Sequence, residues 1–125
     1  MKAMFLAGPL LAATTITATA QYLGNWSANP ADPYSVDNSY GAGNPFDRNS
    51  IKNPIGRFGS PYSSYSTTNP YATHAPKLYD QDGNYRGRLS NNPNDPDSIS
   101  NPNGPYYSPR GPRNGQGLRI YGDED

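Results

Sequence analysis

The sequence contains no cysteine. A chain without cysteine forms no disulfides and carries no thiol nucleophile. It also lacks the N-terminal cysteine through which a bacterial lipoprotein is attached to its lipid. Disulfide-stapled proteins and lipoproteins attached through an N-terminal cysteine are therefore excluded.

Large aliphatic side chains and phenylalanine are also scarce. After residue 20 only 11 occur in 105 residues, well under the ~20% below which a chain struggles to build a core. High net charge, the usual companion of disorder, is absent too, because Lys+Arg and Asp+Glu number ten each. Eleven tyrosines shift the balance, since each can bury a ring while its hydroxyl stays in water. The composition predicts a thin-cored, turn-rich protein near the border between folded and disordered.

Signals for catalysis are missing as well. The one histidine, His74, lies in the loop sequence YATHAP, where an inert role is expected. No Ser-His-Asp set and no carboxylate pair in a cleft can be argued from the sequence. The balanced charge argues against nucleic acid, which binds to a basic face. We therefore predict a protein that is not an enzyme, holds no cofactor and does not bind nucleic acid.

Residues 1–20 have the three parts of a secretory signal peptide. Lys2 gives a positive start, an apolar run follows, and Ala18-Thr19-Ala20 matches the A-x-A cleavage pattern. The apolar run is shorter than the ~20 residues that a membrane span requires, which disfavours an uncleaved anchor. We expect a mature chain that begins at Gln21, is secreted to the periplasm or outside the cell, and does not insert stably into a membrane.

A thirteen-residue pattern occurs four times within residues 29–75 and 92–104. It reads Asn/Ser-Pro-x-Asp/Ser-x-x-Ser-Val/Ile/Thr-x-Asn-Pro/Ser-x-Gly/Ala. The copies begin at four positions: Asn29, Asn44, Ser60 and Asn92. Asn, Asp or Ser before Pro, with Gly in fourth place, is typical of a type I β-turn, and the first side chain can bond its own backbone two residues on. Each copy is therefore predicted to form two tight turns joined by a short bridge.

The bridge carries a β-branched residue in every copy, and these are Val36, Ile51, Thr67 and Ile99. Such a residue between polar neighbours suits a short, half-buried strand. The twelfth position is also large in three copies, at Tyr40, Ile55 and Tyr71. We expect both sets to stack from copy to copy into a small core. The alternative is a largely disordered proline-rich linker, which the fixed spacing disfavours.

Residues 77–89 predict a β-hairpin, because Asp82-Gly83 lies between two short runs with apolar members. The run after this turn matches residues 22–35 at an offset of 63, which aligns Trp26 with Leu89 and predicts that Trp26 packs. The end of the chain resembles the strand before the turn, so residues 105–125 should form a loop and a C-terminal strand. We expect this strand to pair with the first one inside one molecule. Pairing between molecules, and hence self-association through the terminal strands, is the alternative.

Two sets of residues are candidates for binding. Turn-borne tyrosines suit contact with envelope polysaccharide or another protein, because rigid amphipathic rings bind at low entropic cost; they are Tyr34, Tyr40, Tyr62, Tyr71 and Tyr106. Burial in the core is the competing interpretation and is favoured for most of them. Weak candidates for calcium ligands are Asp80, Asp82, Asp95 and Asp97. Their spacing does not match an EF-hand loop, and a role in turns explains them. The closing Asp123-Glu124-Asp125 is interpreted as a solubilising end.

The segments DPDSISNPNG, NPYATHAPKLYDQDGNYRGRLSNNP and GQGLRIYGDED resemble those of uncharacterised secreted bacterial proteins built from Asn-Pro-Tyr-Gly and Asp-Pro-Asp-Ser repeats. The resemblance spans nearly the whole mature chain and implies a small exported protein with no active-site residues to carry over. Together the observations predict one all-β, irregular domain over residues 21–125, with short strands, β-turns and little or no helix. Its predicted function is that of a non-enzymatic structural or interaction module; a calcium-binding module and a disordered exported segment are the alternatives.

Overall fold

The computed structural model describes residues 21–108 and 117–123. This part of the chain contains no helix and four strands: β1 (Tyr22–Trp26), β2 (Lys77–Tyr79), β3 (Tyr85–Arg88) and β4 (Leu118–Tyr121). The strands form one antiparallel sheet in the order β1-β4-β2-β3. The prediction of an all-β, irregular fold is confirmed. The signal peptide predicted for residues 1–20 lies outside the described residues.

The hairpin predicted for residues 77–89 is confirmed by β2 and β3. Its loop closes through two backbone hydrogen bonds of 3.0 Å, from Asp80 N–H to the Asn84 carbonyl and from Gly83 N–H to the Asp80 carbonyl. Gly83 has a φ of +87°, the left-handed conformation that commonly follows a turn in a three-residue hairpin loop. The Asp80 carboxylate accepts the N–H groups of Asp82 and Asn84, each at 2.9 Å. Hydrogen bonds of the Asp80 side chain and of the backbone therefore stabilise the same reversal of chain direction.

The C-terminal strand closes the molecule, because β4 lies between β1 and β2. Its register places Tyr121 opposite Tyr22 and Leu118 opposite Trp26. Ile120 is fully buried and is also paired with Leu78 of β2. Pairing of the terminal strands within one molecule, as predicted, is confirmed.

The two halves of the sheet are related by an approximate two-fold axis through the β2–β4 pair. Leu78 faces Ile120 at the axis, and the rotation relates the Lys77–Tyr121 pair to the Arg119–Tyr79 pair. The two outer strands are equivalent in the same way, at the 63-residue offset found in the sequence. Asn25 of β1 bridges Ser35 in parallel, and Arg88 of β3 bridges Ser98 in parallel. Each edge strand is thus covered by the first turns of the copy that follows it.

The copies themselves are chains of overlapping turns. In the copy that begins at Asn44, four side chains each accept the N–H group two residues on, at 2.9–3.0 Å: Asn44, Asp47, Ser50 and Asn53. The N–H of Asn53 also bonds the Ser50 carbonyl, so the bridge between the two Pro turns is itself a turn. The prediction of a short strand at this bridge is wrong. The local Ser side chain offers the backbone a nearer partner than a neighbouring strand does.

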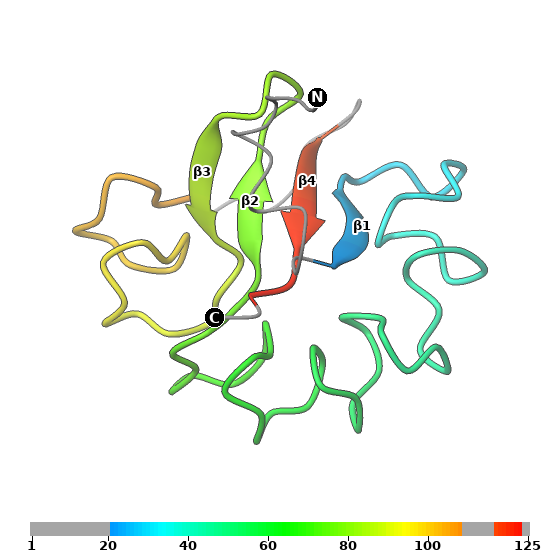
Figure 1. Ribbon diagram of the computed structural model, residues 1–125, viewed down its shortest axis with the longest axis horizontal. Coiled ribbons are helices and arrows are strands. Elements are labelled where there is room, and N and C mark those ends of the chain that lie inside the picture. Colours follow the sequence, from blue (N-terminus) through cyan, green and yellow to red (C-terminus); the bar gives the residue numbers. More distant parts are fainter. Residues whose placement is uncertain (1–20, 109–116, 124–125) are drawn as a thin grey trace, which may run out of the picture.

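The tenth-position asparagine locks each copy. Its side-chain nitrogen donates to the carbonyl of the fourth residue at 3.0–3.2 Å in all four copies, from Asn38, Asn53, Asn69 and Asn101. Its side-chain oxygen meanwhile accepts the N–H of the twelfth residue. Figure 1 shows the turns of the first three copies as an arc that leaves β1, passes one end of the sheet and returns to β2.

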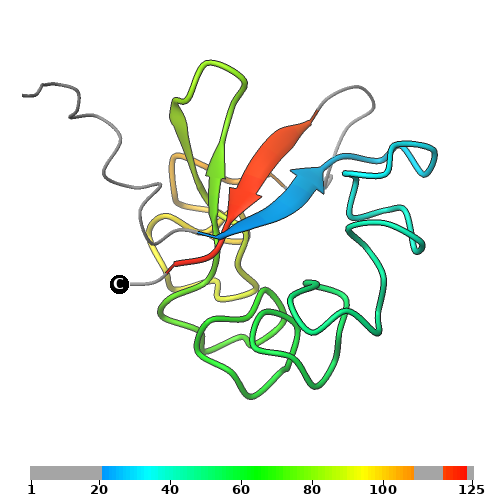
Figure 2. The same cartoon turned by 45° about the vertical axis from the view of Figure 1, so that its right-hand side comes forward.

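The core is formed by side chains from the sheet and from the copies, and the turned view in Figure 2 shows the backbone of the arc curving past one end of the sheet. Buried Val36, Ile51 and Ile99 from the copies meet Leu78 and Ile120 from the sheet, which confirms this part of the predicted core. Thr67, at the same position of the third copy, is half-buried.

The twelfth-position residues do not stack into the core. Tyr40, Ile55 and Tyr71 are 97%, 89% and 82% exposed. Each is the third residue of a tight turn, and the turn directs that side chain away from the chain on either side of it. The prediction that they fill the core is wrong.

Candidate functional site

Six large side chains of the first three copies are strongly exposed, and we call them the turn-tip residues: Tyr34, Tyr40, Phe46, Ile55, Tyr62 and Tyr71. They are 62–97% exposed. Each donates its backbone N–H to the side chain two residues earlier, at 2.9–3.1 Å. The turns therefore hold the backbone beneath every turn-tip residue in place while the ring or aliphatic group faces solvent.

Four of the five tyrosines predicted as a contact surface belong to this set. The interpretation that they fill the core is wrong for Tyr34, Tyr40, Tyr62 and Tyr71. Tyr106 differs, because it is half-buried and its ring lies 5.4 Å from that of Tyr85. Tyr106 therefore belongs to the packing of the sheet and not to the arc.

The turn-tip residues are confined to the first three copies. In the copy that begins at Asn92, the corresponding positions hold the polar residues Asn94, Asp97 and Asn103. The same turn scaffold thus carries apolar tips on the arc between β1 and β2 and polar tips after β3. The apolar surface is a property of one half of the molecule.

A row of tyrosines crosses the sheet. Ring centroids lie 5.4–5.8 Å apart along the series Tyr22, Tyr121, Tyr79, Tyr85 and Tyr106. Tilted and edge-on rings at this spacing attract one another. Burial raises the pKa of Tyr22, Tyr79 and Tyr85, and for Tyr85 the hydrogen bond from its hydroxyl to Asp97 (2.9 Å) acts in the same direction. Sequence reasoning missed this row, although the β-strand offset aligned Tyr22 with Tyr85.

A buried ion pair joins β3 to the end of the chain. Arg88 Nη1 donates to Asp123 Oδ2 at 2.9 Å and to the Ala75 carbonyl at 2.7 Å. His74 Nδ1 lies 3.4 Å from the same carboxylate oxygen, and its ring stacks on Tyr65. Burial alone would lower the pKa of Arg88, but the hydrogen bond and charge of Asp123 raise it above the ordinary value.

Asp123 is only 7% exposed, so its interpretation as part of a solubilising end is wrong. The reason is that β4 is a central strand, which places the residue just after it against Arg88 and not in solvent. Glu124 and Asp125 lie outside the described residues.

The four candidate calcium ligands do not converge. Asp80 accepts hydrogen bonds from Asn84 and Arg86, and the Asn84 N–H is the main cause that lowers the pKa of Asp80. Asp95 accepts the N–H of Asp97 and lies 4.0 Å from Arg88, and Asp97 accepts the Tyr85 hydroxyl. Asp82 is exposed in the hairpin loop. Across residues 21–108 and 117–123, no group of three His, Asp or Glu side chains is placed to hold a metal ion.

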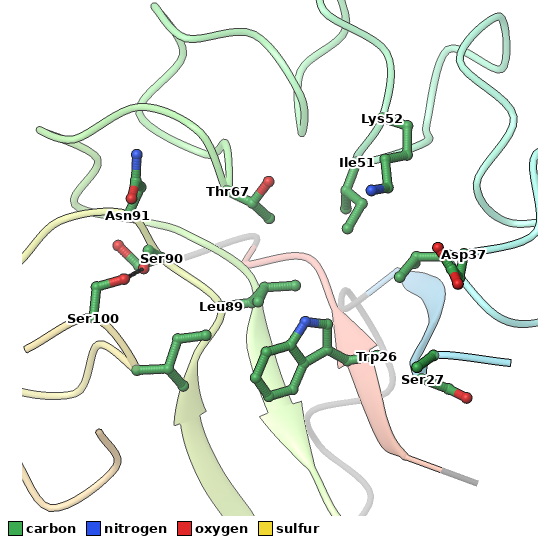
Figure 3. Close-up of a pocket in the computed structure, with 13 residues that line it drawn as sticks. Trp26, Ser27, Asp37, Ile51, Lys52, Thr67, Leu89, Ser90, Asn91 and Ser100 are labelled. Carbon is green, nitrogen blue, oxygen red and sulfur yellow. Dashed lines mark hydrogen bonds between the residues drawn. The ribbon is translucent and has the colours of Figure 1, made fainter. Parts of the chain in front are cut away.

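A pocket of about 430 Å³ lies where the two halves meet (Figure 3). Its walls come in equivalent pairs, Trp26 with Leu89 and Val36 with Ile99, and Ile51 completes them from the second copy. Trp26 is half-buried against the core, in line with the predicted packing role. Sequence reasoning did not identify this pocket, because its residues come from six separate segments.

Comparison of the chain with family models, curated proteins and solved structures finds no match. In the part of the chain that the structure describes, no helix has the length and apolar character needed to cross a membrane.

Proposed function

We propose that this chain is an exported, non-enzymatic interaction module that binds envelope polysaccharide through its turn-tip residues. The observation that carries the proposal is the exposure of six large apolar or aromatic side chains, each the third residue of a tight turn in the first three copies. Isolated exposed apolar residues are ordinary on protein surfaces. Six of them, each held at the third position of a tight turn, exceed scattered exposure and support a binding role.

The rigidity of the turns supports this function. Every turn-tip N–H is bonded to a side chain two residues earlier, so binding would order few additional backbone angles. A tyrosine ring is also large, has few rotatable bonds and combines an apolar face with a hydroxyl. Such rings can stack on the C–H faces of sugars and bond their hydroxyl groups.

The test is co-sedimentation of the purified protein with insoluble bacterial cell-wall polysaccharide. The variant combines Tyr40→Ser, Tyr62→Ser and Tyr71→Ser, three exposed sites at which the core is untouched. We expect the wild type to sediment with the polysaccharide and the variant to bind at least about tenfold more weakly, the effect of about 1.4 kcal/mol of lost contact.

The control replaces Asn94 and Asn103 by Ser, at the equivalent tips of the polar copy. It should bind like the wild type. Equal binding of the triple tyrosine variant, or no binding by the wild type, would reject the polysaccharide proposal.

A further inference from the structure

The central pocket combines apolar walls with a polar rim. Trp26, Leu89 and Ile51 lie among its apolar members, and Asp37, Lys52, Thr67, Asn91 and Ser100 are among its polar ones. Figure 3 shows the Trp26 indole on one side and Thr67 and Lys52 on the other. A volume of about 430 Å³ falls in the range of roughly 300–1,000 Å³ typical of small-molecule sites.

Three polar groups at this pocket have no partner within the described chain. No hydrogen bond or ion pair among residues 21–108 and 117–123 engages the Asp37 carboxylate, the Lys52 ammonium or the Thr67 hydroxyl. Asp37 and Lys52 have opposite charges and line the same pocket, yet they do not form an ion pair. Their hydrogen-bonding capacity is available to a ligand.

Thr67 departs from the rest of the copies at a position that otherwise builds the core. The other three copies place Val36, Ile51 and Ile99 there, and all three are buried. All four residues line the pocket, and only the third copy places a hydroxyl there. The Thr67 hydroxyl is half-buried and reaches solvent, so a ligand could bond it in place of water.

The apolar walls and the polar groups of the pocket together restrict the class of molecule that could bind there. Asp37 and Lys52 are exposed at the rim and Thr67 is half-buried. A purely apolar molecule would leave all three without a bond to it, and any of them that it covered would lose hydrogen bonds to water. An anion would be attracted by Lys52 but repelled by Asp37, and a cation would be attracted by Asp37 but repelled by Lys52. A neutral molecule with several hydroxyl groups and one C–H face satisfies the carboxylate, the ammonium and the indole together.

We propose that the pocket binds a single sugar residue, with one C–H face of the ring against Trp26 and its hydroxyls bonded to Asp37, Lys52 and Thr67. The turn-tip residues are not part of this site, so the proposal stands or falls separately from the proposed function. It adds to that function a site at which one ring is recognised individually.

The chain offers a direct probe, because Trp26 is its only tryptophan. Tryptophan emission of the purified protein is followed during titration with glucose, galactose, mannose and N-acetylglucosamine, each separately, and with sodium octanoate as an apolar anion. We expect at least one sugar to shift the emission saturably and octanoate to leave it unchanged. No shift with any of the four sugars, or a shift with octanoate alone, would overturn the proposal.

Variants at the rim assign the contacts without touching the fluorophore. Asp37→Asn and Thr67→Val should each weaken sugar binding about tenfold, the effect of one lost hydrogen bond involving a charged or desolvated group. Asp82→Asn in the hairpin loop is the matched charge control for Asp37→Asn and should bind like the wild type. If Asp37→Asn and Thr67→Val also bound like the wild type, the sugar would not occupy this pocket.

The triple tyrosine variant separates the two proposals. It should keep the emission shift of the wild type even where it no longer sediments with polysaccharide. Loss of the shift in that variant would mean that the turn tips, and not the pocket, hold the sugar.

Discussion

The tenth-position asparagine supplies, within each copy, hydrogen bonds that neighbouring strands supply in a regular sheet. Asn53 illustrates this, since one amide group both donates to the Asp47 carbonyl and accepts the Ile55 N–H. Asparagine suits the task because its side chain carries a donor and an acceptor at the length that reaches the local backbone.

We predict that Asn53→Ala lowers the free energy of unfolding by about 1–3 kcal/mol, because Asn53 is 8% exposed and its backbone partners would lose their bonds. Urea denaturation measures the change. Asn49→Ala is the control, four residues away, exposed and on the same turn scaffold, and should stay within about 0.5 kcal/mol of the wild type. Similar losses in both variants would contradict the locking role of the tenth position.

Local chemistry explains why the turns could be predicted and the direction of the side chains could not. Asn-Pro and Asp-Pro sequences constrain the backbone through steric contacts within a few residues, and these act before any tertiary structure exists. Whether Ile51 or Ile55 faces the core depends on which side of the turn meets the sheet. Both residues are branched and apolar, so composition alone does not distinguish them.

At the scale of elements, the tyrosine row links all four strands and makes their pairing sensitive to alkali. The pKa of Tyr22, Tyr79 and Tyr85 is raised in the folded protein, so the unfolded chain loses these protons first, near the ordinary value of about 10. Their contribution to stability is therefore complete below about pH 10 and is lost as the pH rises above it.

We predict that the melting temperature falls as the pH is raised from 10 to 12, and that Tyr85→Phe makes this fall shallower by removing one of the titrating groups. Calorimetry over a pH series measures both slopes. Tyr40→Phe, at a fully exposed turn tip, is the comparison and should keep the wild-type slope. An equal change of slope in both variants would assign the effect to tyrosine content and not to the row.

The position of β4 makes the sheet depend on the end of the chain. Removing residues 118–125 would separate β1 from β2 and take Ile120, fully buried, out of the core. We predict that this truncated protein loses cooperative unfolding, which circular dichroism on heating would show. Ile120→Val is the graded comparison and should cost about 0.5–1.5 kcal/mol. A sharp melting transition in the truncated protein would show that β4 is dispensable.

The strand pairs were predictable because the two halves share sequence. The central place of β4 was not predictable. The burial of Asp123 and the tyrosine row depend on it, so they were not predictable either. Strand order depends on contacts between segments far apart in the chain, and no local pattern records it. The pocket follows the same rule, since it exists only once Trp26 and Leu89 meet across the two-fold axis.

At the scale of the whole molecule, the ends of β4 and β1 occupy the place that the hairpin loop occupies between β2 and β3. Tyr121 faces Tyr22 as Tyr79 faces Tyr85, and the Gly122 N–H donates to the Gln21 carbonyl at 2.7 Å. The two connections are therefore interchangeable in geometry.

We predict that a circular permutant folds, with Asp123 joined to Gln21 by three glycines and new ends between Asp82 and Gly83. The new ends fall in an exposed loop, where such cuts are tolerated. Its amide NMR spectrum should keep the wild-type dispersion. The control opens the chain between buried Ser35 and Val36 and should not fold. Failure of the first permutant would mean that the two halves are not equivalent.

The bonds that hold each copy are made almost entirely within about a dozen neighbouring residues. One half of the molecule carries three copies between its strands, whereas the other has a single described copy, and the same sheet accommodates both. We therefore expect that a whole copy can be inserted between β1 and β2 while the strand register stays as it is. Duplication of a copy would then add exposed turn-tip residues, and so change the extent and valency of the binding surface, without altering the sheet.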